Sequence, residues 1–414
     1  MKLKGIFSSK DRKILWHNFF SLSLLQLVTL FLPLITLPYV LRVIGYEKYG
    51  LISLAAALVA YFQAIVDYSF KVTAVRDVVK HKNNLKKLSI IYSRVMIVKL
   101  SLLFVSLTFI TLIVNIYSPF YAEKKLFFYS GLSLIGVVIF PEWFFQGIEK
   151  MKYITLVNIS IRIAFTLSIF IFIKEQSDYL LLPLLTSIGL FFSGLVGQYI
   201  LFKSFKIRFL ILPPKNIKKI IKKNFPIFIN QFIPNLYNNS TSFLLGIMVN
   251  TEMLGVYTAI RKVIDLCVVL LNVVSRVFFP FLNREKEAFI HYRNLMFTLV
   301  LIGLILLFSG KNFIFMYLGL LDPLALPVLL IMGFSVVGFV AYDVYGLNYF
   351  IVKRQDKLVM MNTISSSVIA FAGAVPLIYY FGIIGAALSL FFGRMLMGGG
   401  MFFYYIWKVK VGAQ

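Results

Sequence analysis

The chain has few charged side chains, and acidic ones are the scarcest. Charged residues make up 14% of its 414 residues, with 16 Asp and Glu against 42 Lys and Arg. Apolar residues reach 60% and the mean hydropathy is +0.88, whereas the apolar share of a soluble domain is roughly 45–50%. A soluble globule is therefore excluded. A net charge of +26 alone would suggest nucleic-acid binding. Because the basic residues fit between long apolar runs, we expect no nucleic-acid partner and interpret the charge as a topology signal.

Cysteine and histidine are also rare. The one cysteine, Cys267, excludes a disulfide framework and a cysteine-based metal cluster. The histidines, His17, His81 and His291, lie in or beside basic connecting segments, and no HExxH pattern occurs. No P-loop of the form GxxxxGKS/T is present, so the sequence does not support a process driven directly by ATP hydrolysis in this chain. We expect no metal site and no cofactor.

The apolar runs predict twelve membrane spans. A bilayer core of about 30 Å needs roughly 20 apolar helical residues, and runs of that length recur between charged or turn segments. They cover about 15–41, 49–70, 90–114, 127–146, 153–173, 180–202, 225–249, 255–280, 294–314, 325–350, 359–380 and 383–406.

Every second connecting segment is rich in basic residues, as the positive-inside rule requires. With the N-terminus in the cytoplasm, 29 of the 42 lie in inside segments, six in outside loops and seven within or beside spans. A missed or invented span would reverse this bias further along the chain. We therefore expect a multi-pass protein with both termini cytoplasmic. Every predicted outside loop is short, which leaves no room for a soluble catalytic domain.

The longest polar interval divides the predicted spans six and six. The sequence predicts an N-lobe over 1–202, a basic cytoplasmic linker over 203–224 and a C-lobe over 225–414. The two halves share short sequence matches. Glu47 and Glu252 are 205 positions apart, and so are Gly50 and Gly255. Six spans per half restore the same orientation, so the repeat would be parallel, with a pseudo-twofold axis along the membrane normal.

Polar residues inside several spans share one helix face. At 100° per residue these stripes predict faces turned to protein or to a wet cavity, because a polar group facing lipid is costly. The uncharged members suit either substrate contact or hydrogen bonds between helices. The stripes are Tyr92, Lys99 and Ser106; Thr155, Asn158, Arg162 and Thr166; Gln231, Asn235, Asn238 and Ser242; and Arg261, Asp265, Asn272 and Arg276.

Ionisable residues within spans are functional candidates by default. The seven basic ones are Arg94, Lys99, Arg162, Arg261, Lys262, Arg276 and Arg394, and the four acidic ones are Asp67, Glu142, Asp265 and Asp343. Arg94 and Arg276 lie near cytoplasmic span ends, where long basic side chains snorkel.

Part of this intramembrane charge is expected to be paired. The spacing of i and i+4 predicts the pairs Asp67–Lys71 and Arg261–Asp265. The remaining excess of basic over acidic groups suits an anionic substrate. Because Arg and Lys form charge-assisted hydrogen bonds to phosphate oxygens, a diphosphate is the expected ligand.

Several motifs resemble a known transporter family. They are Pro33-Leu-Ile-Thr-Leu-Pro38-Tyr39, Asp67-Tyr-Ser-Phe70, Glu142-Trp-Phe-Phe-Gln146-Gly147, Gly255-Val-Tyr257-Thr-Ala-Ile-Arg-Lys262 and Phe278-Phe-Pro280. Together they resemble the Wzx-type O-antigen and capsular repeat-unit flippases, in the polysaccharide-transport branch of the multidrug/oligosaccharidyl-lipid/polysaccharide exporter (MOP) superfamily. Two positions depart from the family pattern: Ser69, where it often has Gly, and Arg261, where it often has Glu.

The resemblance implies an all-α, MATE-like membrane protein of two six-helix lobes. It implies a flippase that moves an undecaprenyl-diphosphate-linked oligosaccharide across a bacterial inner membrane by alternating access through a cationic cavity. The energy for transport would come from an ion gradient, with H⁺ or Na⁺ as the coupling ion. Expected partners are the lipid-linked substrate, membrane lipids and the polysaccharide polymerase with its chain-length machinery.

The expected site residues form two groups. The diphosphate and glycan would contact Lys99, Arg162, Arg261, Lys262, Arg394, Asn158, Gln231, Asn235, Asn238 and Asn272. Coupling or gating would involve Asp67, Lys71, Glu142, Gln146 and Asp265. Glu142, Gln146 and Glu149 share one helix face, which suits either a gate or an interfacial polar patch.

Two other functions compete with this interpretation. A multidrug exporter would share the fold but predicts a cavity dominated by acids. A membrane polysaccharide polymerase or glycosyltransferase would need a sizeable outside loop or a DxD motif, and the sequence contains neither. Lipid II flippases share the superfamily and usually carry two further spans.

Overall fold

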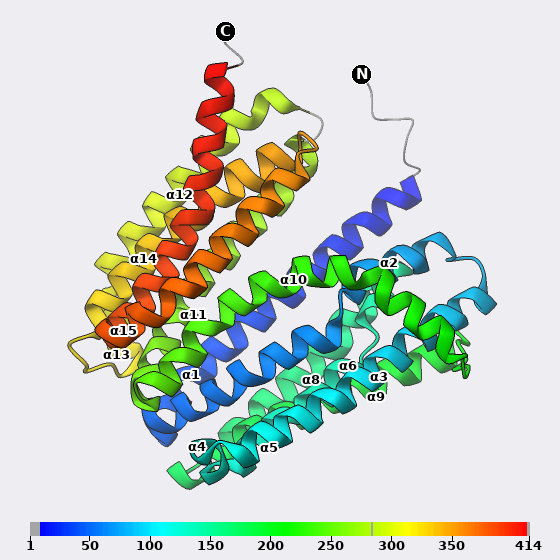
Figure 1. Cartoon of the computed structure of the whole chain (residues 1–414), viewed down its shortest axis with the longest axis horizontal. Coiled ribbons are helices and arrows are strands. Elements are labelled where there is room, and N and C mark those ends of the chain that lie inside the picture. Colours follow the sequence, from blue (N-terminus) through cyan, green and yellow to red (C-terminus); the bar gives the residue numbers. More distant parts are fainter. Residues whose placement is uncertain (1–8, 283–284, 412–414) are drawn as a thin grey trace. The chain divides into compact units, whose positions relative to one another are not determined.

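The computed structural model describes residues 9–282 and 285–411, and these fold into helices without any strand (Figure 1). The first half contains α1 (Ser9–Asp67), α2 (Phe70–Lys80), α3 (Leu85–Ile116), α4 (Ser118–Ala122), α5 (Lys124–Gly131), α6 (Ser133–Ile139), α7 (Glu142–Gly147), α8 (Met151–Phe172), η2 (Gln176–Leu180) and α9 (Leu181–Ser204).

The second half continues in the same way. It contains α10 (Pro214–Met248), α11 (Thr251–Leu282), η3 (Lys286–Ala288), α12 (Phe289–Ser309), α13 (Lys311–Leu318), α14 (Ala325–Ala341), η4 (Tyr342–Ile351) and α15 (Asp356–Val411). The segment η4 is a π-helix, a form that occurs mostly as short insertions within α-helices and frequently at functional sites.

Twelve helical segments match the predicted spans. Eight stretches of the described residues are long and apolar enough to cross a membrane. Two of them bend in the middle, because Gly45 (φ 77°) and Gly382 (φ 53°) leave the helical conformation and divide α1 and α15 into two limbs each. Positive φ strains residues with a Cβ, so glycine suits both bends. The helices α10 and α11, of 35 and 32 residues, complete the set.

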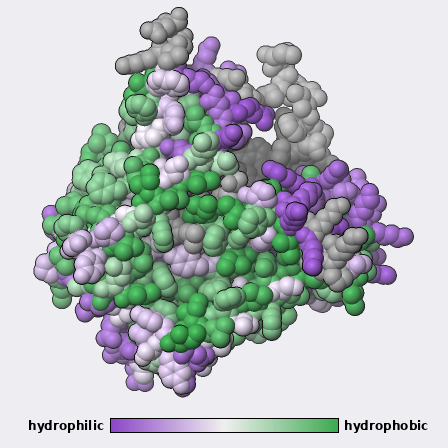
Figure 2. Space-filling view, in the orientation of Figure 1, coloured by the Kyte–Doolittle hydropathy of each residue, from purple (hydrophilic) through white to green (hydrophobic). Residues whose placement is uncertain are grey.

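The outer faces of the helices are apolar. On the face drawn in Figure 2, hydrophobic side chains cover most of the surface. Along α12, Leu301, Ile302, Ile305 and Leu306 are all exposed. In water such a surface would be unfavourable, because burial of apolar area is the main stabilising term in folding. A lipid environment removes that cost.

The helices form two compact units. Unit 1 comprises Met1–Thr36 and Leu58–Gln231, and unit 2 comprises Leu37–Ala57 and Phe232–Gln414. The limb around Gly45 therefore groups with the second half of the chain. In unit 1, α9 packs along α6 and α8, while α3 packs along α5 and α6. In unit 2, α14 packs along α15, α11 and α12.

The basic segment after α9 forms hydrogen bonds with other parts of unit 1. The hydroxyl of Ser93 accepts a hydrogen bond from the backbone N–H of Leu210 (2.7 Å), and that of Ser89 accepts one from Arg208 N–H (3.1 Å). The Tyr68 hydroxyl donates to the carbonyl of Ile221 (3.1 Å). These bonds tie residues 208–221 to α3 and to the turn after α1.

Two glycines of the sequence repeat meet within unit 2. A methyl group on Gly50 would overlap the carbonyl oxygen of Thr251, and one on Gly255 would overlap the carbonyl oxygen of Tyr46. The second limb of α1 and the first turns of α11 therefore touch backbone to backbone. Small residues permit this approach between membrane helices.

Candidate functional site

A strained turn after α1 positions the first charged residues of the site. Tyr68 (φ 40°) and Ser69 (φ 63°) both have left-handed backbone conformations, which cost roughly 1–2 kcal/mol for residues with a Cβ. The turn separates Asp67, the last residue of α1, from Lys71 in the first turn of α2. Strain of this kind concentrates at functional sites.

Asp67 is shared by two lysines. Its Oδ2 lies 3.1 Å from Lys71 Nζ, the predicted pair, and its Oδ1 lies 3.3 Å from Lys99 Nζ on α3. The Lys99 side chain is 3% exposed, whereas that of Lys71 is 50% exposed. The Lys99 ammonium also lies within 3.5 Å of the Val137 carbonyl oxygen on α6. Asp67 thus holds one buried and one half-exposed cation.

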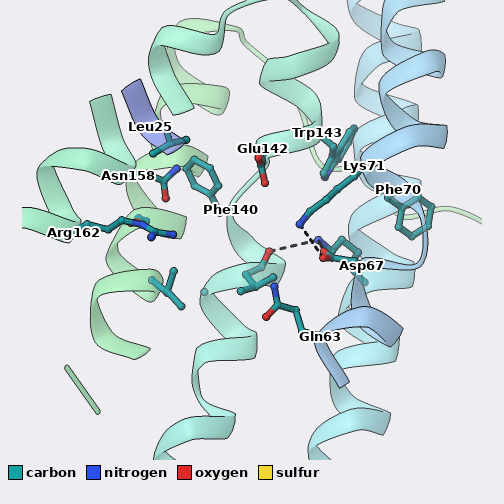
Figure 3. A pocket seen from close by; sticks show the side chains of 15 residues that line it. Leu25, Gln63, Asp67, Phe70, Lys71, Phe140, Glu142, Trp143, Asn158 and Arg162 are labelled. Atoms are coloured by element: carbon teal, nitrogen blue, oxygen red, sulfur yellow. Dashed lines mark hydrogen bonds and ion pairs between the residues drawn. The ribbon is translucent and has the colours of Figure 1, made fainter. Parts of the chain in front are cut away.

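These residues line a cavity of about 180 Å³ inside unit 1. In Figure 3, Arg162 reaches into it from α8, Lys71 reaches in from the opposite side, and Glu142 points down between them. Asn158, one turn before Arg162, borders the same space and donates to the Ile154 carbonyl (2.9 Å). Three basic side chains, Lys71, Lys99 and Arg162, face two acidic ones, Asp67 and Glu142.

Two hydrogen-bond donors at this cavity have no partner among the described residues. They are Nε of Arg162 and the indole Nε1 of Trp143, and both atoms are buried. A buried donor without a partner costs about 1–3 kcal/mol. The lining of the cavity thus combines two buried donors without a partner with more basic than acidic side chains.

A second charged cluster lies within unit 2. Asp265 Oδ2 is 3.7 Å from Arg261 Nε, the predicted pair, and Asp265 Oδ1 is 3.5 Å from Arg394 on α15. Ser242 accepts a hydrogen bond from Arg261 (3.2 Å), and Ser335 accepts one from Arg394 (3.0 Å). One carboxylate thus faces two guanidinium groups, and the cluster keeps a net positive charge.

The other predicted site residues lie outside these two clusters. Gln146 donates to Glu142 (3.2 Å) and does not line the cavity. Lys262 and Gln231 are exposed, and Asn272 is half-buried. The side chains of Asn235 and Asn238 lie outside the part of the chain that the structure describes. The structure thus brings Asp67, Lys71, Lys99, Glu142, Asn158 and Arg162 together in one unit and Arg261, Asp265 and Arg394 in the other.

Several residues at these positions could not be assigned a role from the sequence patterns. Gln63 borders the cavity because it precedes Asp67 by four residues, a spacing that could have identified it. Trp143 belongs to a recognised motif but had no assigned role. Asp343, counted only as an intramembrane acid, is 1% exposed and accepts hydrogen bonds from Ser275 and Tyr292. No periodicity in the sequence connects Ser275, Tyr292 and Asp343.

The fold is that of the MOP superfamily transporters. The chain aligns with the lipid II flippase MurJ in an inward closed conformation with a TM-score of 0.72 and 16% identity, covering 92% of this chain and 87% of that one. It aligns with an inward-facing multidrug resistance MATE family transporter with a TM-score of 0.67 and 12% identity, covering 94% and 98%. At these identities the likeness establishes the fold.

Sequence comparison identifies the family. Residues 15–286 match the polysaccharide biosynthesis protein family, and the chain belongs to it. It is 27% identical over 385 residues to the "Putative O-antigen transporter" of Escherichia coli strain K12, covering 90% of this chain and 92% of that protein. A protein of the same name from Shigella dysenteriae is 24% identical over 372 residues, covering 88% and 93%. Together with its apolar helices, this family membership makes the chain a multi-pass membrane protein.

Proposed function

We propose that this protein is a flippase for undecaprenyl-diphosphate-linked oligosaccharide repeat units of an O-antigen, capsule or exopolysaccharide. The lipid-linked unit would cross from the cytoplasmic to the outer leaflet of a bacterial inner membrane. Its diphosphate and sugars need a wet polar path, while the polyprenyl tail can stay in lipid. The names of its sequence relatives support transport of such a substrate.

The observation that carries the proposal is the pair of unpartnered donors at the unit 1 cavity. Arg162 Nε and Trp143 Nε1 are buried there without a hydrogen-bond partner among the described residues. The surrounding charge is positive, and an arginine can bind phosphate oxygens in a bidentate way. The diphosphate would complete the hydrogen bonding of both donors. Asn158, Gln63 and Ser193 line the same cavity and suit sugar hydroxyls.

A multidrug exporter is less well supported by this cavity. Recognition of a lipophilic cation would favour an excess of acids, whereas the lining has more basic than acidic residues. The likeness to the MATE transporter concerns the fold alone. A polymerase or glycosyltransferase would need catalytic groups outside the bundle, and the connections between the described helices are short. We therefore propose a transporter rather than an enzyme.

Complementation of a flippase-deficient strain tests the function. Wild-type protein should restore surface polysaccharide and prevent accumulation of the lipid-linked unit. Arg162→Gln should lose most of this activity, because one charge-assisted hydrogen bond is worth about 1.5–3 kcal/mol, or roughly ten- to a hundredfold in affinity. Arg162→Lys should retain part of it. Lys125→Gln removes an exposed charge away from the cavity and is the matched control. Full activity of Arg162→Gln would contradict the cationic-cavity proposal.

The proposed topology has its own test. With both termini in the cytoplasm, reporter fusions after residues 178 and 214 should report opposite sides of the membrane. A result that places both reporters on the same side would exclude the twelve-span arrangement with lobes 1–202 and 225–414.

A further inference from the structure

The segment between α9 and α10 folds back along α3 within unit 1. Residues 206–213 form neither helix nor strand. The backbone N–H groups of Arg208 and Leu210 donate to the hydroxyls of Ser89 and Ser93. These two serines lie on successive turns of α3, about 6 Å apart along its axis. From residue 208 to residue 210 the chain therefore runs in the direction in which α3 enters the membrane.

The depth of this segment follows from the length of α3. The helix Leu85–Ile116 is apolar enough to cross a membrane, and the proposed topology places its first turn in the cytoplasm. Ser93 lies eight residues after Leu85, which is roughly 12 Å along the helix. The headgroup region of each leaflet is only about 5–8 Å thick. We therefore expect Leu210, beside Ser93, to lie at the level where headgroups meet acyl chains.

The side chains of the segment separate into an inner and an outer set. Ile207 is 3% exposed and packs into the core of unit 1. Phe209 is 48% exposed and meets the ring of Tyr92 at its edge, while Ile211 is 93% exposed. An isoleucine this exposed to water would be unfavourable, because apolar surface gains free energy when it leaves water. Acyl chains of the leaflet would remove that cost.

Basic side chains accompany this apolar tip. Lys206 and Arg208 are exposed, and neither forms an ion pair among the residues that the structure describes. Lys86 is also exposed and precedes Ser89 and Ser93 by three and seven residues, so it shares their face of α3. The segment thus carries cations on the side from which α3 begins and apolar side chains further along the helix.

Acidic residues are missing from the elements that carry these cations. The sequence contains no Asp or Glu between Asp178 and Glu252, and α3 contains none. Glu149, an acid from the turn after α7, forms an ion pair with Lys82 (2.7 Å). The positive charge of the segment is therefore available to an anionic partner.

We propose that Lys86 and residues 206–211 form a surface that binds an anionic phospholipid of the cytoplasmic leaflet. Phe209 and Ile211 lie among the acyl chains, and the cations contact the phosphate-containing headgroup. This inference goes beyond the proposed flipping, because the bound lipid is a resident of the membrane and not the transported molecule. The contact would hold unit 1 at a fixed depth in the leaflet.

The combination of charge and apolar surface selects this partner. A zwitterionic lipid would satisfy Phe209 and Ile211 but would leave the cations without a matching net charge. A soluble acidic protein would match the cations but would not need a segment that runs along a membrane-spanning helix. A role in membrane insertion alone depends on the number of basic residues and does not explain the backbone hydrogen bonds to Ser89 and Ser93.

Photolabelling of the purified full-length protein in detergent tests the charged part of the surface. A photoreactive phosphatidylglycerol should label peptides that contain residues 206–211 in a saturable way. Unlabelled phosphatidylglycerol should compete, whereas phosphatidylcholine with the same acyl chains should not. Lys206→Gln/Arg208→Gln should raise the half-saturating concentration about 25-fold, since each basic residue near the membrane surface contributes about fivefold, or about 1 kcal/mol. Lys124→Gln/Lys125→Gln removes the same charge from exposed positions of α5 and should label like wild type.

Spin labelling tests the apolar part. Ile211→Cys in a Cys267→Ser background, labelled with a nitroxide and reconstituted in phosphatidylglycerol-containing vesicles, should collide more with oxygen, which concentrates in lipid, than with a water-soluble nickel chelate. Asn83→Cys in the same background is the control, because Asn83 lies in the exposed turn between α2 and α3. Its label should collide more with the chelate.

Each measurement can overturn the proposal. Equal competition by the two lipids, or unchanged half-saturation in Lys206→Gln/Arg208→Gln, excludes an anionic-lipid site. A label at position 211 that meets the chelate as often as one at position 83 overturns it in favour of a surface for a soluble acidic partner. Thermal unfolding checks folding, and Lys86→Gln, with an expected loss of about fivefold, decides the matter if the double variant is unstable. Neither assay uses the lipid-linked substrate, so their results are independent of the complementation test.

Discussion

Lys99 and Asp67 form an ion pair between α3 and the end of α1, with Nζ and Oδ1 3.3 Å apart and the lysine almost fully buried. The pair fixes the carboxylate beside the strained turn at Tyr68 and Ser69. It also places one cationic group at the wall of the unit 1 cavity. The positive character of this wall therefore depends on a contact between residues 32 positions apart.

Removal of the buried lysine should destabilise the protein. Lys99→Met leaves Asp67 with only the half-exposed Lys71, and breaking a buried pair costs about 3 kcal/mol or more. Thermal unfolding of the purified variant in detergent measures the loss. The double variant Asp67→Asn/Lys99→Met should recover part of it. Lys71→Met is the control and should cost less than about 1 kcal/mol, as exposed pairs do. Equal losses for Lys71→Met and Lys99→Met would contradict this account.

Glycine at position 69 should stabilise the turn. Ser69 has φ 63° and its buried hydroxyl has no partner among the described residues. Ser69→Gly removes both the backbone strain and the unsatisfied hydroxyl, and after the entropic cost of glycine the net gain should be about 0.5–1 kcal/mol. Ser106→Gly is matched, since Ser106 also has a buried unpartnered hydroxyl but lies inside α3. It also removes an unpartnered hydroxyl but places glycine in a helix interior without relieving strain, so it should be about 1 kcal/mol less stable than Ser69→Gly in the same unfolding assay. A destabilised Ser69→Gly variant would disprove the strain argument.

The backbone contact at Gly50 and Gly255 should tolerate no side chain. Gly50→Ala and Gly255→Ala place a methyl group against a backbone carbonyl, which cannot move aside like a side chain. Each should cost about 1–3 kcal/mol, the range for overpacking. Gly303→Ala and Gly399→Ala are the controls, because nothing lies within 4 Å of a Cβ at either helical position. They should be neutral or slightly stabilising. If all four variants unfold at the same temperature, the close contact has no energetic role.

Trp143 should affect transport through its indole N–H. Trp143→Phe keeps an aromatic ring in the buried cluster with Tyr92 and Phe144 but removes the unpartnered donor. If that N–H binds the substrate, the variant should require about five- to tenfold more lipid-linked substrate for half-maximal flipping in proteoliposomes, since a hydrogen bond is worth about 1 kcal/mol. Phe144→Leu alters the same cluster without removing a donor. A similar change in both variants would indicate packing rather than substrate binding.

The sequence was sufficient for the helical membrane fold and for local charge pairs. Apolar runs and the alternation of basic loops depend on residues near one another in the chain, and so do the pairs Asp67–Lys71 and Arg261–Asp265, both of which the structure contains. The resemblance found in the motifs agrees with the family match. The glycine that the family favours at position 69 also has a local explanation, since the backbone there has positive φ.

Only the tertiary structure decided which distant groups meet. Lys99 with Asp67, and Arg394 with Asp265, pair across helices, and helical periodicity carries no information about such partners. Asp343 and Asn348 share a face because η4 is a π-helix, whereas the 100° rule would separate them. The sequence by itself determined that this chain crosses the membrane and carries excess positive charge within it, because hydropathy and charge are summed over neighbouring residues. The fold decided where that charge is paired and where it lines a cavity, because those contacts depend on how the helices pack.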